Sequence, residues 1–176
     1  MRIAITGSSN DLVPHLQYDL LVSCRVETLN EASVEPFDTD VFINCAHVDF
    51  EQVRLFDLFY NKWKNDKSKH IINISSRAAE PNISKGKLYA SQKAALNHYS
   101  NNVVYNDELK FCKVSTINLG LMNSNLPSLS WRDVAQLIHT IIDYGKKDIE
   151  IPEITFQHAY NYVKIQKQKT TLSSKV

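Results

Sequence analysis

Residues 69–96 read KHIINISSRAAEPNISKGKLYASQKAAL and join a short apolar run to a longer amphipathic segment. The run from Lys69 to Ile74 predicts a buried strand that ends at Ser75 and Ser76. A helix is predicted over 87–106, with apolar side chains at helical spacing on one side. Because a strand is followed at once by a helix, this stretch is typical of one unit of an α/β fold.

Strand and helix also alternate in the rest of the chain. Further strands are predicted at residues 3–5, 21–26, 40–45, 111–117 and 149–156, and further helices at about 12–21, at 50–65 and after a cap at Ser130. Residues 29–38 carry no clear element. This order predicts a Rossmann-like, doubly wound parallel sheet in a three-layer αβα arrangement. We expect a single domain over residues 1–160 and a polar tail over 161–176.

Composition excludes several classes of function. The chain has 176 residues, of which 43% are apolar, and its 20 Lys and Arg nearly balance 19 Asp and Glu. A net charge of +1 argues against binding nucleic acid through bulk charge. No apolar run approaches the length of a membrane span, and the N-terminus lacks the pattern of a signal peptide.

The cysteines and histidines show no ligand or disulfide pattern. Three cysteines, at 24, 45 and 112, are an odd number without C-x-x-C spacing, which indicates a reducing compartment. We therefore expect a cytoplasmic protein. The six histidines have no metal-ligand spacing, so no metal site is expected.

Ligands of doubly wound sheets bind at the carboxyl ends of the strands, which directs attention to Tyr89, Lys93 and Ser76. Tyr89 and Lys93 are four residues apart on one predicted helix and share a face. A nearby ammonium favours a tyrosinate, so this tyrosine could exchange a proton with a substrate oxygen. Ser76, at a strand end, could donate a hydrogen bond to the same oxygen. A surface tyrosine and lysine on an amphipathic helix would give the same spacing.

Five motifs in order resemble the short-chain dehydrogenase/reductase family, from Met1 to about Phe156. Thr6-Gly7 begins that family's Thr-Gly-x-x-x-Gly-x-Gly turn, and Asn44-Cys45-Ala46-His47 stands in place of Asn-Asn-Ala-Gly. The strand IINISS at 71–76, the helix YASQKAAL at 89–96 and Asn118-Leu119-Gly120 match the remaining motifs.

The resemblance implies a role for each matching residue. Tyr89 would be the general acid/base, Lys93 would hold the nicotinamide ribose and lower the pKa of Tyr89, and Ser76 would orient the substrate oxygen. Residues implied to contact NADP or NAD are Gly7, Ser8, Ser9, Asn10, Arg25, Asn44, Ala46, Tyr89, Lys93 and Gly120. Arg25 favours NADP by pairing with a 2′-phosphate, although it could equally pair with Glu27. The substrate would be a small carbonyl or alcohol, and the family's usual packing implies a homodimer or tetramer.

The chain also departs from the family pattern. The second and third glycines of the Gly-rich turn are replaced by Asp11 and Val13, and Asp11 places a carboxylate where a dinucleotide phosphate should bind. The family's catalytic asparagine has no clear match; by spacing it falls near Asp49 or Glu51. The chain is truncated, with little sequence between Val26 and Asp40.

Two functions follow from these observations. One is an NAD(P)-dependent oxidoreductase that moves a hydride between nicotinamide and a carbonyl or alcohol. The other is a non-catalytic relative that has lost dinucleotide binding and serves as a scaffold, sensor or interaction module.

Overall fold

The computed structural model describes residues 1–6, 12–16, 20–24, 35–81, 83, 86–107 and 109–160. Within these ranges, six parallel strands form one sheet in the order β2-β1-β3-β4-β5-β6. The strands are β1 (Arg2–Thr6), β2 (Leu20–Cys24), β3 (Val41–Asn44), β4 (His70–Ser76), β5 (Lys113–Leu119) and β6 (Glu153–Phe156). The predicted Rossmann-like α/β fold is confirmed.

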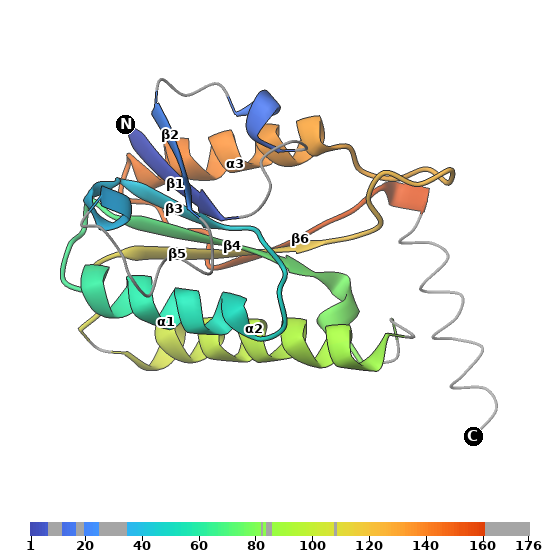
Figure 1. Cartoon of the computed structure of the whole chain (residues 1–176), viewed down its shortest axis with the longest axis horizontal. Helices are drawn as coiled ribbons and strands as arrows, with labels where there is room; N and C mark the ends of the chain where they lie inside the picture. Colours follow the sequence, from blue (N-terminus) through green and yellow to red (C-terminus); the bar gives the residue numbers. More distant parts are fainter. Residues whose placement is uncertain are drawn as a thin grey trace.

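Helices cover both faces of the sheet, as Figure 1 shows. On one face lie α1 (Glu51–Trp63) and α2 (Lys87–Asn106), and on the other lies α3 (Trp131–Gly145). Short 3₁₀ turns complete the described elements: η1 (Val13–His15), η3 (Glu35–Asp38) and η4 (Arg77–Ala79). The three-layer αβα arrangement therefore agrees with the prediction.

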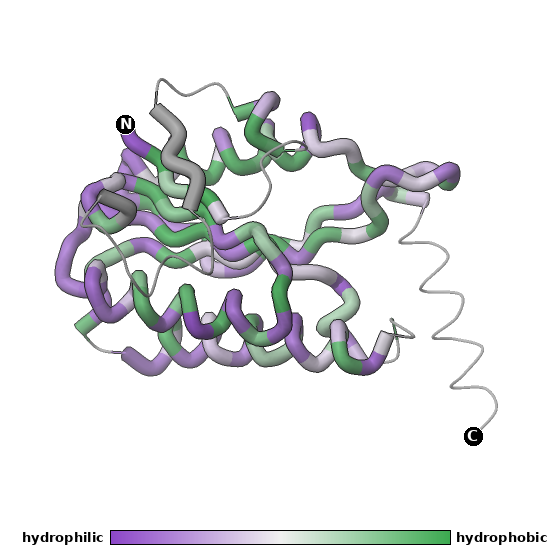
Figure 2. Tube along the Cα trace, in the orientation of Figure 1, coloured by the Kyte–Doolittle hydropathy of each residue, from purple (hydrophilic) through white to green (hydrophobic). Residues whose placement is uncertain are grey.

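Side chains of each strand alternate between two hydrophobic cores. Ile3, Ile43 and Ile72 point to the α3 side, whereas Ala4, Phe42 and Ile71 point to the α1 and α2 side. Both faces are apolar because both are covered, which explains the nearly continuous apolar runs of the strands. Figure 2 shows hydrophobic and hydrophilic residues alternating along α1, as expected for a helix with one buried side.

Most predicted elements agree with the structure to within a few residues. The helix over 87–106 has the predicted bounds, and Ser130 caps α3 as predicted: its side chain and that of Asp133 form a capping box. The last strand is shorter than predicted and begins at Glu153. A 3₁₀ turn, η3, lies in the segment for which no element was predicted.

The predicted helix over 12–21 is wrong. Among the described residues of this segment, only the three of η1 are helical. Leu16 is already extended (φ −87°, ψ 102°), and β2 begins at Leu20. Pro14 has no N–H to continue a helical ladder. Leu12 and Leu16 are both buried, so their four-residue spacing reflects core packing around a tight turn.

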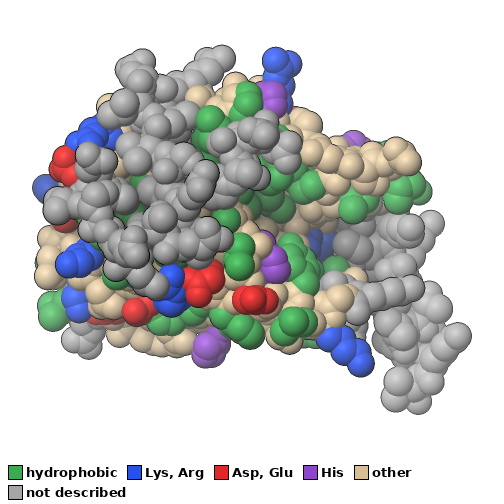
Figure 3. Space-filling model, viewed as in Figure 1, with side chains coloured by type: hydrophobic (Ala, Val, Ile, Leu, Met, Phe, Trp, Pro, Cys, Tyr) green, Lys and Arg blue, Asp and Glu red, His purple; other side chains and the backbone are tan. Residues whose placement is uncertain are grey.

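No helix in the part of the chain that the structure describes is long and apolar enough to cross a membrane. The predicted tail at 161–176 lies outside the described residues. On the face shown in Figure 3, acidic, basic and apolar side chains are interspersed, in keeping with a net charge of +1.

Candidate functional site

The carboxyl ends of the strands bring together Tyr89, Lys93 and two residues that sequence analysis missed. Tyr89 lies in the first turn of α2 and is 37% exposed. Lys93, one turn later, is only 3% exposed, and its Nζ lies 5.7 Å from the centre of the Tyr89 ring. The predicted shared face of these two residues is therefore present.

The ammonium of Lys93 is held by two acceptors inside the protein. Its Nζ donates to Oε1 of Gln52 at 2.6 Å and to the carbonyl oxygen of Ile74 at 2.9 Å. Burial lowers the pKa of Lys93 to about 8, and the nearby thiol of Cys45 partly opposes this shift. Two hydrogen bonds offset much of the cost of burying a charged group.

Gln52 is the residue that sequence spacing failed to identify. Its Nε2 donates to the carbonyl oxygens of Asn44 (2.9 Å) and Ile74 (3.1 Å), while its Oε1 accepts from Lys93. One buried side chain of α1 thereby joins the ends of β3 and β4 to α2. The spacing argument pointed to Asp49 or Glu51, and the sequence signal for Gln52 was only its position, four residues before Phe56 on the apolar helix face.

Asn44 faces the interior. Its Nδ2 donates to the carbonyl oxygen of Gln52 (2.8 Å) and to Oδ1 of Asn73 (3.0 Å). Oδ1 of Asn44 and Nδ2 of Asn73 are buried and have no hydrogen-bond partner within the described residues. Asn44 thus contributes to the network beneath Lys93.

The loop after β3 is fastened by Thr6 at the end of β1. The Thr6 hydroxyl accepts hydrogen bonds from the backbone N–H groups of Cys45 (3.0 Å) and Ala46 (3.1 Å). This places Ala46 between the ends of two neighbouring strands, at the edge where ligands of such sheets bind.

His47, in the same loop, is the second missed residue. Its ring packs edge-on against Tyr89 with 4.7 Å between ring centres, and its Nε2 lies 2.8 Å from Oε1 of Gln92. Gln92 is a buried residue of α2 that also donates to Oδ1 of Asp49 at 3.4 Å. The exposed His47 ring is therefore anchored from α2.

Ser76 lies at the end of β4, where its hydroxyl accepts from the backbone N–H of Ala78 at 3.1 Å and caps η4. No hydrogen bond joins Ser76 to Tyr89 within the described part of the chain. The Ser76 hydroxyl keeps its own proton for donation to a ligand.

Gly120 follows β5 at a place of close packing. A Cβ built on Gly120 would lie 2.5 Å from Cβ of Gln157, so no side chain fits without displacing the chain after β6. Arg77 holds Gln157 in place through a hydrogen bond to its side chain and is itself paired with Glu80 at 2.6 Å. Glycine is required here for strand packing, whatever ligand binds nearby.

Several predicted cofactor residues fall outside the described ranges. They are Gly7, Ser8, Ser9, Asn10 and Arg25. What the structure does describe next to the Gly-rich turn is η1, a single 3₁₀ turn of three residues. No three His, Cys, Asp or Glu side chains among the described residues come together as metal ligands.

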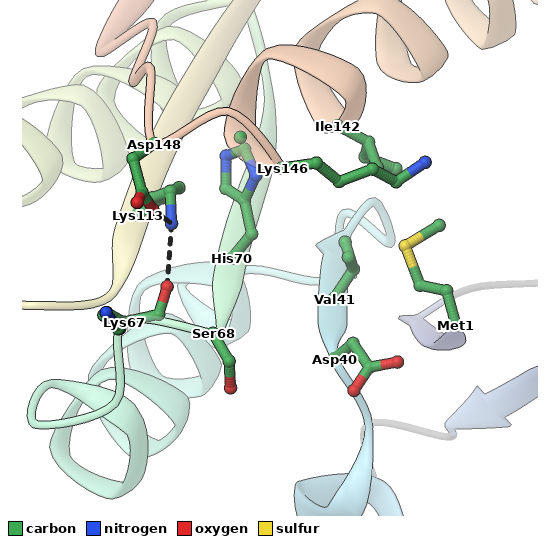
Figure 4. Close-up of a pocket in the computed structure, with 11 residues that line it drawn as sticks. Met1, Asp40, Val41, Lys67, Ser68, His70, Lys113, Ile142, Lys146 and Asp148 are labelled. Carbon is green, nitrogen blue, oxygen red and sulfur yellow. Dashed lines mark hydrogen bonds and ion pairs between the residues drawn. The ribbon is translucent and has the colours of Figure 1, made fainter.

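A second feature is a pocket of about 200 Å³ at the amino-terminal ends of the strands, on the side of the sheet away from Tyr89 (Figure 4). The buried ring of His70, at the start of β4, lines it together with Asp40, Lys113 and Asp148. Burial, together with the charges of Lys113 and Lys110, lowers the pKa of His70 to about 3, so this imidazole is neutral. Its Nε2 pairs with the hydroxyl of Ser115 at 3.0 Å.

Comparison with known proteins identifies the fold. No family model matches the chain, and no curated protein is significantly similar to it in sequence. Solved structures do match it, among them serine dehydrogenase from Escherichia coli, with a TM-score of 0.70 and 16% identity over 89% of this chain and 97% of that one. An alcohol dehydrogenase from the archaeon Thermococcus sibiricus, complexed with 5-hydroxy-NADP, gives 0.72 and 14% over 91% and 97%.

A third match is the 3-alpha-hydroxysteroid dehydrogenase from Pseudomonas sp. B-0831, complexed with NADH, with a TM-score of 0.68 and 15% identity over 89% of this chain and 94% of that one. The chain therefore has the fold of the short-chain dehydrogenases/reductases, in a form shorter than these neighbours. Identities this low establish the fold, and the activity is argued from the site.

Proposed function

We propose that the protein is an NAD(P)-dependent oxidoreductase that interconverts a carbonyl and an alcohol, with Tyr89 as general acid/base. The observation that carries the proposal is the pairing of an exposed phenol with a buried ammonium, 5.7 Å from the ring centre, at the carboxyl edge of the sheet. A surface tyrosine and lysine would not require Lys93 to be buried, because burying a lysine costs free energy that a solvated position avoids.

The residues of the site divide the chemistry as follows. In the reduction direction, the Tyr89 hydroxyl gives its proton to the substrate oxygen, and the Ser76 hydroxyl donates a hydrogen bond to that oxygen. Lys93, one helical turn after Tyr89, would hold the nicotinamide ribose. A bound nicotinamide dinucleotide supplies the hydride.

The remaining cofactor contacts are part of the same proposal. Gly7, Ser8, Ser9 and Asn10 would surround the pyrophosphate, and Arg25 would favour NADP over NAD. Ala46 and Gly120 would line the cofactor from the ends of β3 and β5, and Asn44, whose side chain is buried, would support this edge from within. The fastening of Ala46 by Thr6 supports this arrangement, because it keeps the loop after β3 close to β1. A homodimer through α1 and α2 stays a prediction.

A titration with NADPH and NADH, followed by nicotinamide fluorescence and by quenching of Trp63 and Trp131, tests cofactor binding. We expect micromolar binding, a preference for NADPH that disappears in Arg25→Ala, and cofactor-dependent turnover of a carbonyl. Tyr89→Phe should abolish turnover and leave cofactor affinity almost unchanged, because only the transferred proton is removed. Tyr105→Phe, at an exposed position near the end of the same helix, is the matched control. Unchanged turnover in Tyr89→Phe would exclude the proposed role.

One observation favours the second candidate, a non-catalytic protein without dinucleotide binding. Phosphate groups bind well at the N-terminus of an α-helix, and the described residues after the Gly-rich turn form only the three-residue η1. This candidate predicts no NADPH or NADH binding at millimolar concentration. Recovery of binding in Asp11→Gly would then identify the carboxylate as the cause.

A further inference from the structure

The carboxyl ends of β4, β5 and β6 are level with one another. Their last paired residues lie in one row across the sheet and are Ser76, Leu119 and Phe156. Arg77, Gly120 and Gln157 come directly after this row, and β5 lies between β4 and β6. Gly120 therefore separates Arg77 from Gln157, and its N–H donates to the carbonyl oxygen of Phe156 at 2.8 Å.

The side chain of Arg77 bridges this row. Its Nη1 donates to Oε1 of Gln157, so one hydrogen bond joins the segment after β4 to the segment after β6. Gln157 packs closely on Gly120, because a Cβ on the glycine would lie 2.5 Å from Cβ of Gln157. Arg77 therefore holds Gln157 in the space that a side chain at position 120 would need.

The other two nitrogens of the Arg77 guanidinium bind Glu80. Nε and Nη2 donate to the two carboxylate oxygens at 2.6 and 2.8 Å, and the Arg77 side chain is buried. Two parallel hydrogen bonds fix the plane of a guanidinium, and the ammonium of a lysine cannot reproduce them. All three guanidinium nitrogens have partners within the protein, which suits a supporting residue and not a ligand site.

We propose that Arg77 is a positioning residue that keeps Ser76 and Gly120 at a fixed separation, an inference that rests on the oxidoreductase function proposed above. In that function Ser76 binds the substrate oxygen, and the backbone near Gly120 lines the cofactor. Arg77 follows Ser76 directly and reaches Gly120 through Gln157, so the bridge sets the distance between substrate and cofactor. Hydride transfer depends steeply on this distance, since a displacement of about 1 Å can cost about 100-fold in rate.

The bridge can be tested without turnover, because the chain has only four glycines. Leu119 is the only leucine that precedes one of them, so labelling the full chain with ¹⁵N-glycine and ¹³C-leucine identifies the NMR signal of the Gly120 amide. Arg77→Lys should shift this signal. The signal of Gly145, which lies at the amino-terminal ends of the strands, should stay in place. An unchanged Gly120 signal in Arg77→Lys would overturn the proposal.

Turnover tests the positioning role. Arg77→Lys and Gln157→Leu should each lower kcat by about tenfold or more, with a dissociation constant for NADPH within about twofold of the wild type. A residue that only stabilised the fold would lower the free energy of unfolding and leave kcat of the folded protein unchanged. Gln157→Glu, which keeps an acceptor for Arg77, should retain more of the wild-type kcat than Gln157→Leu.

Arg54→Lys is the matched control. Arg54 pairs with Glu51 at the same i,i+3 spacing and at 2.6 Å, but on the exposed side of α1, so this variant should keep the wild-type kcat. A wild-type kcat in Arg77→Lys, or an equal kcat in Gln157→Glu and Gln157→Leu, would overturn the positioning role. A wild type without NADPH-dependent turnover would remove the proposed function and this role with it, whereas the Gly120 signal would still report on the bridge.

Discussion

Lys93 is a buried residue that can carry a charge. The free energy of unfolding therefore depends on whether its side chain is protonated. Burial lowers the pKa of Lys93 from 10.5 to about 8, whereas an unfolded chain keeps the ordinary value. Between these values the unfolded state binds a proton that the folded state has released. The free energy of unfolding therefore rises with pH in this window, because raising the pH removes the cost of a buried ammonium.

Replacing Lys93 by methionine should remove this pH dependence. In the wild type we expect the free energy of unfolding to rise between pH 8 and 9, by up to about 1.4 kcal/mol per pH unit, and in Lys93→Met we expect no such rise. Urea unfolding at several pH values measures it, with the exposed Lys87→Met as control. Above pH 9 the effect is opposed by Cys112, whose thiol pKa burial raises to about 12. If the free energy of unfolding changed equally with pH in the wild type and in Lys93→Met, the rise would not be due to Lys93.

Among the elements, α3 and β4 meet at a point that leaves no room for a side chain. Gly145 ends α3 directly over the ring of His70, and a Cβ on Gly145 would lie 2.8 Å from Nδ1 of that ring. Gly145 and His70 are 75 residues apart in the chain. Their contact therefore depends on how the helix lies across the sheet and not on local sequence.

Gly145→Ala should destabilise the protein, although alanine favours helices over glycine by about 1 kcal/mol. We expect a loss of about 1–3 kcal/mol, because the new methyl group must displace the His70 ring or the end of α3. Chemical denaturation of a double-mutant cycle tests the cause: in a His70→Ala background the same substitution should be neutral or stabilising. If Gly145→Ala lowered the free energy of unfolding equally in the wild type and in His70→Ala, the contact with the His70 ring would not be the cause.

At the scale of the whole molecule, the burial of His70 makes the free energy of unfolding depend on pH in the acid range. Its ring is buried by β4, β5 and α3 together, and burial is the largest reason why its pKa falls from 6.5 to about 3. Between these values the unfolded chain binds a proton that the folded one does not. Stability is therefore lost as the pH falls below about 6.5.

His70→Gln should remove most of this acid sensitivity. The wild type should lose up to about 1.4 kcal/mol per pH unit between pH 6.5 and 5, and His70→Gln should show a much flatter dependence. Thermal or urea unfolding over this range measures it. Aspartates with lowered pKa, such as Asp66 and Asp133, act in the same direction but only at lower pH. The control His98→Gln should show the same pH dependence as the wild type. If His70→Gln and His98→Gln gave the same pH dependence of the free energy of unfolding, His70 would not be its cause.

The candidate site was predictable only where it depended on short-range spacing. Tyr89 and Lys93 share a face because they are one helical turn apart. Gln52 and Lys93 are 41 residues apart and meet only because α1 and α2 pack side by side on one face of the sheet. His47 and Tyr89 meet because the loop after β3 lies against the first turn of α2.

The sequence by itself determined the order of strands and helices, the parallel sheet and the face that carries Tyr89 and Lys93. These follow from apolar periodicity, caps and turn residues, which act over a few neighbouring positions. Tertiary structure alone decided that Val13–His15 would form a 3₁₀ turn, that Gln52 would hold Lys93, and that His70 would lie beneath Gly145. Each of these depends on which distant groups compete for the same buried space and the same hydrogen bonds, and no local pattern encodes that competition.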